Sequence, residues 1–117
     1  MEIITGTTDF YLKEETAVAI GKFAGVHVGN RRLLQEILSQ KPKGKRACVF
    51  SFDPNPSVFF NHTTEMELST REEKRDLFEQ MGIDILIEFP MNEVTASMEP
   101  RRFVQEILCN RMNTHFL

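Results

Sequence analysis

Short apolar segments alternate with amphipathic helical segments along this chain, and the alternation constrains the fold more than any other feature. The apolar segments are residues 2–5, 16–21, 45–52 and 83–89, and 114–117 resembles the start of another. Strands separated by helices imply right-handed crossovers and a parallel sheet with helices on both faces. We therefore expect an α/β fold in which ligands bind beyond the carboxyl ends of the strands.

Three helices are expected between these strands. Their apolar positions recur at helical spacing and are Leu33, Leu34, Ile37 and Leu38, then Leu77, Phe78 and Met81, then Phe103, Val104, Ile107, Leu108 and Met112. The first helix begins near Asn30, and Pro42 and Gly44 stop it. A capping box of Ser69 and Glu72 starts the second helix, Gly82 ends it, and Pro100 starts the third.

Composition narrows the class of protein. A chain of 117 residues fits one domain, residues 1–117. Its net charge of −3 gives no reason to expect nucleic acid, and it holds no stretch of the roughly 20 apolar residues that would span a membrane. Two distant cysteines and three scattered histidines predict reduced thiols and no metal site. These features favour a cytoplasmic protein that acts on small molecules.

The stretch "AIGKFAGVHVGNRRLL", residues 19–34, joins a strand to a helix through a glycine-rich turn. Gly21, Gly25 and Gly29 recur every four residues, with His27 among them. Glycines let backbone N–H groups approach a ligand, and the following helix points its positive end to the same place. The spacing alone leaves two interpretations open: a phosphate site, or a plain turn with His27 on the surface.

A second loop is expected at the same edge of the sheet. "DPNP", residues 53–56, follows the strand at 45–52 and opens an irregular stretch that runs to residue 67. Pro54 and Pro56 bar regular strand pairing there. Loops this long often bind ligands.

Four segments together resemble the bacterial FAD synthetases, the nucleotidyltransferase part of bifunctional riboflavin kinase/FMN adenylyltransferases. "GKFAGVHVGN" (21–30) is similar to the family pattern G-x-F-D-G-V-H-x-G-H, and "VFSFDPNP" (49–56) is similar to its F-x-P-x-P segment. "LSTREEKRDLFEQMGID" (68–84) and "FVQEIL" (103–108) match two later segments in the right order. The resemblance implies a Rossmann-like nucleotidyltransferase fold.

The resemblance also implies roles for individual residues. The reaction would be attack of the FMN phosphate on the α-phosphorus of ATP, which gives FAD and pyrophosphate, with Mg²⁺ neutralising the phosphates. His27 and Asn30 would occupy the catalytic positions. The ATP phosphates would lie against Gly21, Lys22, Phe23, Ala24, Gly25 and Gly29. The flavin-side loop would comprise Asp53, Pro54, Asn55 and Pro56.

Two positions depart from the family pattern. Ala24 stands where the family has aspartate, and Asn30 stands where it has the second histidine of H-x-G-H. Both changes remove an ionisable group, and such losses cost on the order of 10² to 10⁴ in rate. The sequence does not distinguish deliberate inactivation from a degenerate copy, but it predicts impaired catalysis.

The resemblance covers only the first part of the family domain. A later glycine-aromatic segment, a Ser/Thr-Arg motif and the riboflavin kinase module have no counterpart in these 117 residues. We therefore expect a C-terminally truncated sheet with an uncovered edge, marginal stability and possible homo-oligomers. Two alternatives are another H-x-G-H transferase and a non-catalytic nucleotide- or flavin-binding fragment.

Overall fold

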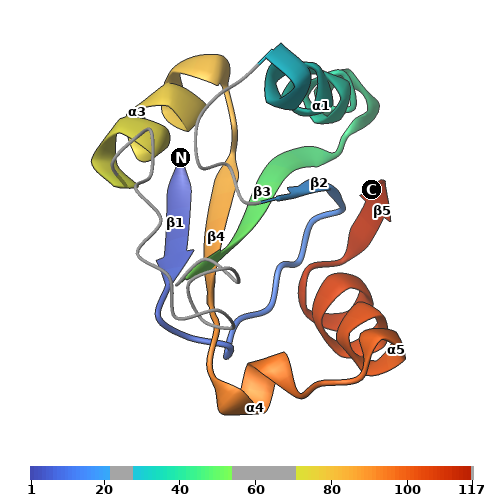
Figure 1. Ribbon diagram of the computed structural model, residues 1–117. Coiled ribbons are helices and arrows are strands. Elements are labelled where there is room, and N and C mark those ends of the chain that lie inside the picture. The colour runs from blue at the N-terminus through green and yellow to red at the C-terminus, as the bar shows by residue number, and fades with distance from the viewer. Residues whose placement is uncertain (22–27, 54–70, 117) are drawn as a thin grey trace.

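The computed structural model describes residues 1–21, 28–53 and 71–116 (Figure 1), and the side chains of residues 28–30 and 71 are outside this description. Five strands form one sheet: β1 Glu2–Thr5, β2 Thr16–Ile20, β3 Arg46–Asp53, β4 Ile85–Pro90 and β5 Thr114–Phe116. The helical elements are α1 Val28–Leu38, η1 Lys41–Lys43, α3 Arg71–Met81, α4 Glu93–Ala96, α5 Pro100–Phe103 and η2 Val104–Arg111.

All the strand pairs are parallel, in the order β1-β4-β3-β2-β5. The predicted α/β class, the parallel sheet and its five strands are confirmed. From β2 the chain steps through α1 to β3 and through α3 to β4, always in one direction. It then returns to the other side of β2 to form β5, so the strand order reverses at β2 (Figure 1).

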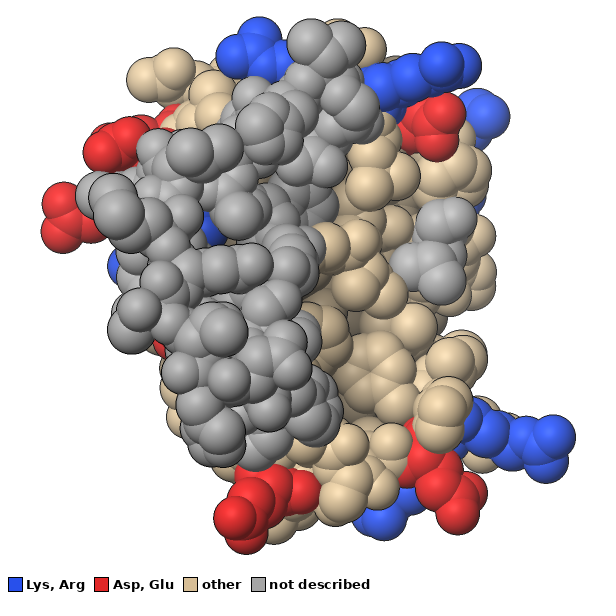
Figure 2. Space-filling model, viewed as in Figure 1, with Lys and Arg blue, Asp and Glu red and all other residues tan. Residues whose placement is uncertain are grey.

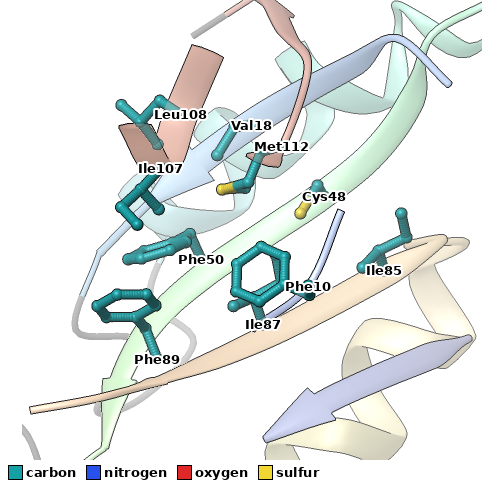
Figure 3. Packing of buried hydrophobic residues seen from close by; sticks show 10 residues of the cluster. All are labelled: Phe10, Val18, Cys48, Phe50, Ile85, Ile87, Phe89, Ile107, Leu108 and Met112. Carbon is teal, nitrogen blue, oxygen red and sulfur yellow. The ribbon is translucent and has the colours of Figure 1, made fainter. Parts of the chain in front are cut away.

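Each face of the sheet has its own apolar core, because successive strand residues point to opposite faces. Ala17, Ala19, Ala47, Val49 and Leu86 pack against Leu34 and Ile37 of α1 and Phe78 of α3. Val18, Cys48, Phe50, Ile87 and Phe89 pack against Ile107, Leu108 and Met112 on the opposite face (Figure 3). Helices therefore cover both faces, as the sequence predicts.

The last helix differs from the expectation. It begins at Pro100 as predicted, but η2 is a π-helix, in which the Met112 N–H donates to the Ile107 carbonyl five residues back. Because a π-helix has more than four residues per turn, one side of the helix carries Phe103, Ile107, Leu108 and Met112. Val104 turns away and is 45% exposed, so its assignment to the apolar face was wrong.

Glycines in the left-handed region end two helical elements. Gly44 (φ 88°) follows η1, which contains Pro42, whereas α1 already ends at Leu38. Gly82 (φ 94°) follows α3 as expected. Ser69 of the predicted capping box lies outside the described residues. Helix α4, which has its own capping box of Asn92 and Thr95, was not predicted.

Candidate nucleotide site at the carboxyl edge of the sheet

Two of the predicted site segments leave neighbouring strands at the same edge. Gly21 directly follows β2, and its N–H donates to the Phe50 carbonyl of β3 at 3.1 Å. Asp53 is the last residue of β3. Because β2 and β3 are parallel, both segments start from the carboxyl edge. Lys22 to His27 and Pro54 to Pro56 lie outside the described residues.

The glycine-rich segment follows β2, and β2 is the strand at which the strand order reverses. In open parallel sheets this switch point is where a crevice forms for a ligand, because the neighbouring crossovers run to opposite faces. Helix α1 starts at Val28, so the backbone of Gly29 and Asn30 belongs to its first turn. The unpaired N–H groups of a helix start favour anions such as phosphate.

On the α1/α3 face, a charged pair lies near this edge. Glu88 of β4 is opposite Ser51 of β3, one residue beyond the row that pairs Phe50 with Ile87. The Glu88 side chain is only 8% exposed, and Arg75 of α3 donates from Nη2 to Oε1 at 2.6 Å and from Nε to Oε2 at 3.3 Å. The hydrogen bonds that Arg75 donates to Glu88 raise the pKa of Arg75 above its usual value.

Sequence reasoning missed this pair. The signal for it was the single glutamate inside the apolar run "ILIEF", residues 85–89. A buried carboxylate needs a partner, but the sequence does not say which basic residue supplies it.

On the opposite face, four phenylalanine rings cluster at the carboxyl ends of β3 and β4. Phe50 and Phe89 have ring centroids 5.2 Å apart, and Phe52 lies edge-on to Phe50 at 5.3 Å. Phe103 of α5 lies 5.7 Å from Phe50 and closes the group. Phe52 and Phe103 are half-buried. Figure 2 shows an uncharged area over the right half of the view, with charged side chains above and below it.

The described part of the chain contains no candidate metal site and no candidate membrane-spanning helix. Within residues 1–21, 28–53 and 71–116, no group of three or more His, Cys, Asp and Glu side chains could hold a metal ion. No described helix is both long and apolar enough to cross a membrane. Cys48 is buried, which raises the pKa of its thiol, and Cys109 is exposed; both are free.

A cavity of about 210 Å³ lies at the opposite edge of the sheet. It is lined by Glu2, Tyr11, Leu12, Lys13, Glu14, Arg46 and Ile85. Glu2, Arg46 and Ile85 begin β1, β3 and β4, so the cavity is separate from the carboxyl edge.

Comparison with known proteins connects this geometry to a family. The family model for FAD synthetase matches residues 10–117. The chain is 29% identical over its full length to the bifunctional riboflavin kinase/FMN adenylyltransferase of Buchnera aphidicola subsp. Schizaphis graminum, and covers 38% of that protein. It is 31% identical over 83% of its length to the protein of the same description from Bacillus subtilis, and covers 33% of it. A Listeria monocytogenes FAD synthetase is 32% identical over 86% of the chain, which covers 42% of that protein.

A solved structure has the same fold. The structure titled as a macrolide-efflux protein from Streptococcus pneumoniae superposes with a TM-score of 0.78 over 96% of this chain and 44% of that one, at 18% identity. The chain spans between a third and about two-fifths of the length of the curated relatives it matches. By the family match over residues 10–117, the chain belongs to the FAD synthetase family.

Proposed function

We propose that this chain binds ATP and FMN at the carboxyl edge of its sheet for transfer of AMP to FMN, which yields FAD and pyrophosphate. The observation that carries the proposal is the reversal of strand order at β2, directly before the glycine-rich segment. That position is where doubly wound sheets receive nucleotides. Membership of the FAD synthetase family supports the choice of substrates.

The ATP phosphates are assigned to Gly21, Lys22, Phe23, Ala24, Gly25 and Gly29, with His27 and Asn30 at the catalytic positions. Support for this side comes from Gly21 at the end of β2 and from the start of α1 at Val28. Backbone N–H groups at such a helix start bind phosphate without needing a charged side chain.

The flavin is assigned to the side of Asp53, Pro54, Asn55 and Pro56. The half-buried rings of Phe52 and Phe103 support this assignment, because they form an aromatic surface at the end of β3, one residue before Asp53. Flat aromatic rings stack favourably on other aromatic rings. The isoalloxazine ring of FMN is large, flat and largely apolar on its faces.

The chemistry needs positioning more than it needs a reactive side chain. An oxygen of the FMN phosphate attacks the α-phosphorus of ATP, a new P–O–P bond forms, and pyrophosphate leaves with the electrons of the broken P–O bond. Fixed donors at the phosphates stabilise the developing charge. Mg²⁺ is proposed to arrive bound to the phosphate oxygens of ATP, the ligands it commonly uses in nucleotide sites.

Ala24 and Asn30 favour a second function for the chain alone, namely binding of nucleotide or flavin without efficient turnover. Asn30 can donate a hydrogen bond, but its amide cannot carry the positive charge of an imidazolium. Binding depends on backbone groups that both substitutions leave in place. Binding and turnover are therefore expected to be separable in this chain.

Titration with FMN and with MgATP tests the proposal. FMN should bind with quenched flavin fluorescence, and MgATP should shift the amide resonances of Gly21, Gly29 and Asn30. FAD formation by the 117-residue chain should be slow. Absence of binding by both ligands would overturn the proposal, whereas binding of both without FAD would establish the second function.

A further inference from the structure

The carboxylate of Glu88 is buried at one end of an otherwise apolar surface. On the α1/α3 face, the sheet presents Ala17, Ala19, Ala47, Val49 and Leu86. Glu88 follows Leu86 on this face and is 7% exposed as a residue. Burying a charge is costly unless it is paired and hydrogen-bonded, so Glu88 depends on the partner it has.

That partner is Arg75, one helical turn into α3. The two-point contact uses Nε and Nη2 and fixes the plane of the guanidinium against the carboxylate. Arg75 also lies within electrostatic reach of Asp53, at the end of β3, and of Glu72, in the first turn of α3. Its side chain is 27% exposed, so it lies at the margin of the core rather than in solvent.

Arg75 therefore interacts electrostatically with a residue near each end of the segment 54–70. Asp53 precedes that segment and Arg71 follows it. The ends of β3 and β4 are in turn joined by the Met91 N–H, which donates to the Asp53 carbonyl at 2.9 Å. Glu88 lies in β4, two residues before Pro90. Pro90 is the residue that pairs with Asp53 in the register of β3 and β4.

We infer that Arg75, held by Glu88, is a positioning residue that fixes the ends of β3 and β4 relative to the start of α3 and thereby orients Asp53 on the flavin side of the site. The inference deepens the proposed function and, for its flavin part, rests on it. It assigns Arg75 no contact with the reacting phosphates.

Amide hydrogen exchange tests the positioning without any ligand. At the carboxyl ends of β3 and β4, the Met91 N–H donates to the Asp53 carbonyl. At their amino ends, the Asp84 N–H donates to the Ala47 carbonyl at 2.9 Å. Arg75→Met should accelerate exchange of Met91 relative to Asp84 by about tenfold, because a charge-assisted contact is lost. Glu88→Gln keeps an acceptor and should give a smaller change, and it supplies a folded variant if Arg75→Met destabilises the whole domain.

A matched control is Arg102→Met, because Arg102 also donates from Nε to a carboxylate, Glu106, at 3.0 Å, but in an exposed i,i+4 pair on the last helix. It should leave the Met91 to Asp84 exchange ratio unchanged. An unchanged ratio in both Arg75→Met and Glu88→Gln would overturn the positioning role.

Ligand binding tests the flavin part. Arg75→Met should weaken FMN binding by about tenfold and MgATP binding by less than about twofold, and Arg75→Lys, which retains the charge, should recover part of the FMN affinity. Equal weakening of both ligands would contradict a specific effect on the flavin side. If the unaltered chain bound no FMN, the flavin assignment itself would be wrong, and the exchange ratio would still decide whether Arg75 fixes the strand ends.

Discussion

Restoring the two departures from the family pattern, Ala24→Asp with Asn30→His, should raise catalysis while lowering stability slightly. Asn30 lies in the first turn of α1, which starts at Val28. A protonated histidine there meets the positive end of the helix and costs about 0.3–1 kcal/mol. The catalytic gain expected from two ionisable groups at the phosphates is larger, on the order of 10² to 10⁴ in rate, or about 3 to 5 kcal/mol.

The two effects have opposite consequences that can be measured separately. The stability cost exists only while the introduced histidine is protonated, so it should shrink as the pH rises through the ordinary histidine pKa of about 6.5. Urea unfolding at pH 5.5 and pH 8 measures this difference. Gln35→His is the control, because Gln35 is exposed in the same helix but beyond its first turn.

FAD formation from FMN and MgATP measures the gain. It is best assayed in two forms, the 117-residue chain and a chimera in which the chain replaces the matching segment of the Bacillus subtilis relative, of which it covers 33%. The double substitution should increase FAD formation by at least about a hundredfold in the chimera. The short chain should gain little, since positioning groups from the rest of that relative are not supplied. No gain in the chimera would refute the roles assigned to positions 24 and 30, and fast turnover by the short chain would refute the need for the remainder.

Three further predictions concern the described fold. Burial raises the pKa of Cys48, so the thiol loses its proton at lower pH in the unfolded chain than in the folded one. The free energy of unfolding should therefore fall above pH about 8.5, by up to about 1.4 kcal/mol per pH unit. In urea unfolding, Cys48→Ala should remove this slope, whereas Cys109→Ser should not. Gly82→Ala should lower the free energy of unfolding by about 1–3 kcal/mol in the same measurement, because φ is 94° at this position. The cost comes from the backbone alone, since the new Cβ would make only ordinary contacts at 3.7 Å or more. An unchanged free energy of unfolding would contradict this backbone strain. Phe103→Ala should weaken FMN binding in a fluorescence titration, whereas Val104→Ala, at the exposed neighbouring position, should not; equal effects would remove the aromatic surface from the proposed site.

The strands and their parallel arrangement could be predicted because burial on both faces produces continuous apolar runs. Residues 45–52 and 83–89 were expected, and β3 Arg46–Asp53 and β4 Ile85–Pro90 agree to within two residues. Helix ends at glycine could also be predicted, as at Gly82, because few residues accept a positive φ.

The winding of the last helix could not be predicted in the same way. A period of 3.6 residues places Val104 beside Phe103 on the apolar side, and only the i to i+5 bonding of η2 turns it outward. The choice between an α-helix and a π-helix depends on how these residues pack against the sheet, and the local sequence does not contain that information. The short helix α4 was missed for a different reason: none of its residues is buried, so it has no apolar periodicity, and its only signal is the capping box of Asn92 and Thr95.

The pairing of Arg75 with Glu88 lay beyond sequence reasoning because it joins a helix to a strand thirteen residues away through tertiary packing. Stability alone does not account for the pair, since apolar residues of similar size at both positions are often as stable as a buried ion pair or more so. Leucine at position 88 would continue the surface of Ala47, Val49 and Leu86 without needing a partner. An apolar pair, however, would tolerate sliding of α3 along β4, whereas two directed hydrogen bonds allow one arrangement. The pair is thus placed where geometry matters more than stability, between the ends of two strands and the proposed flavin side of the site.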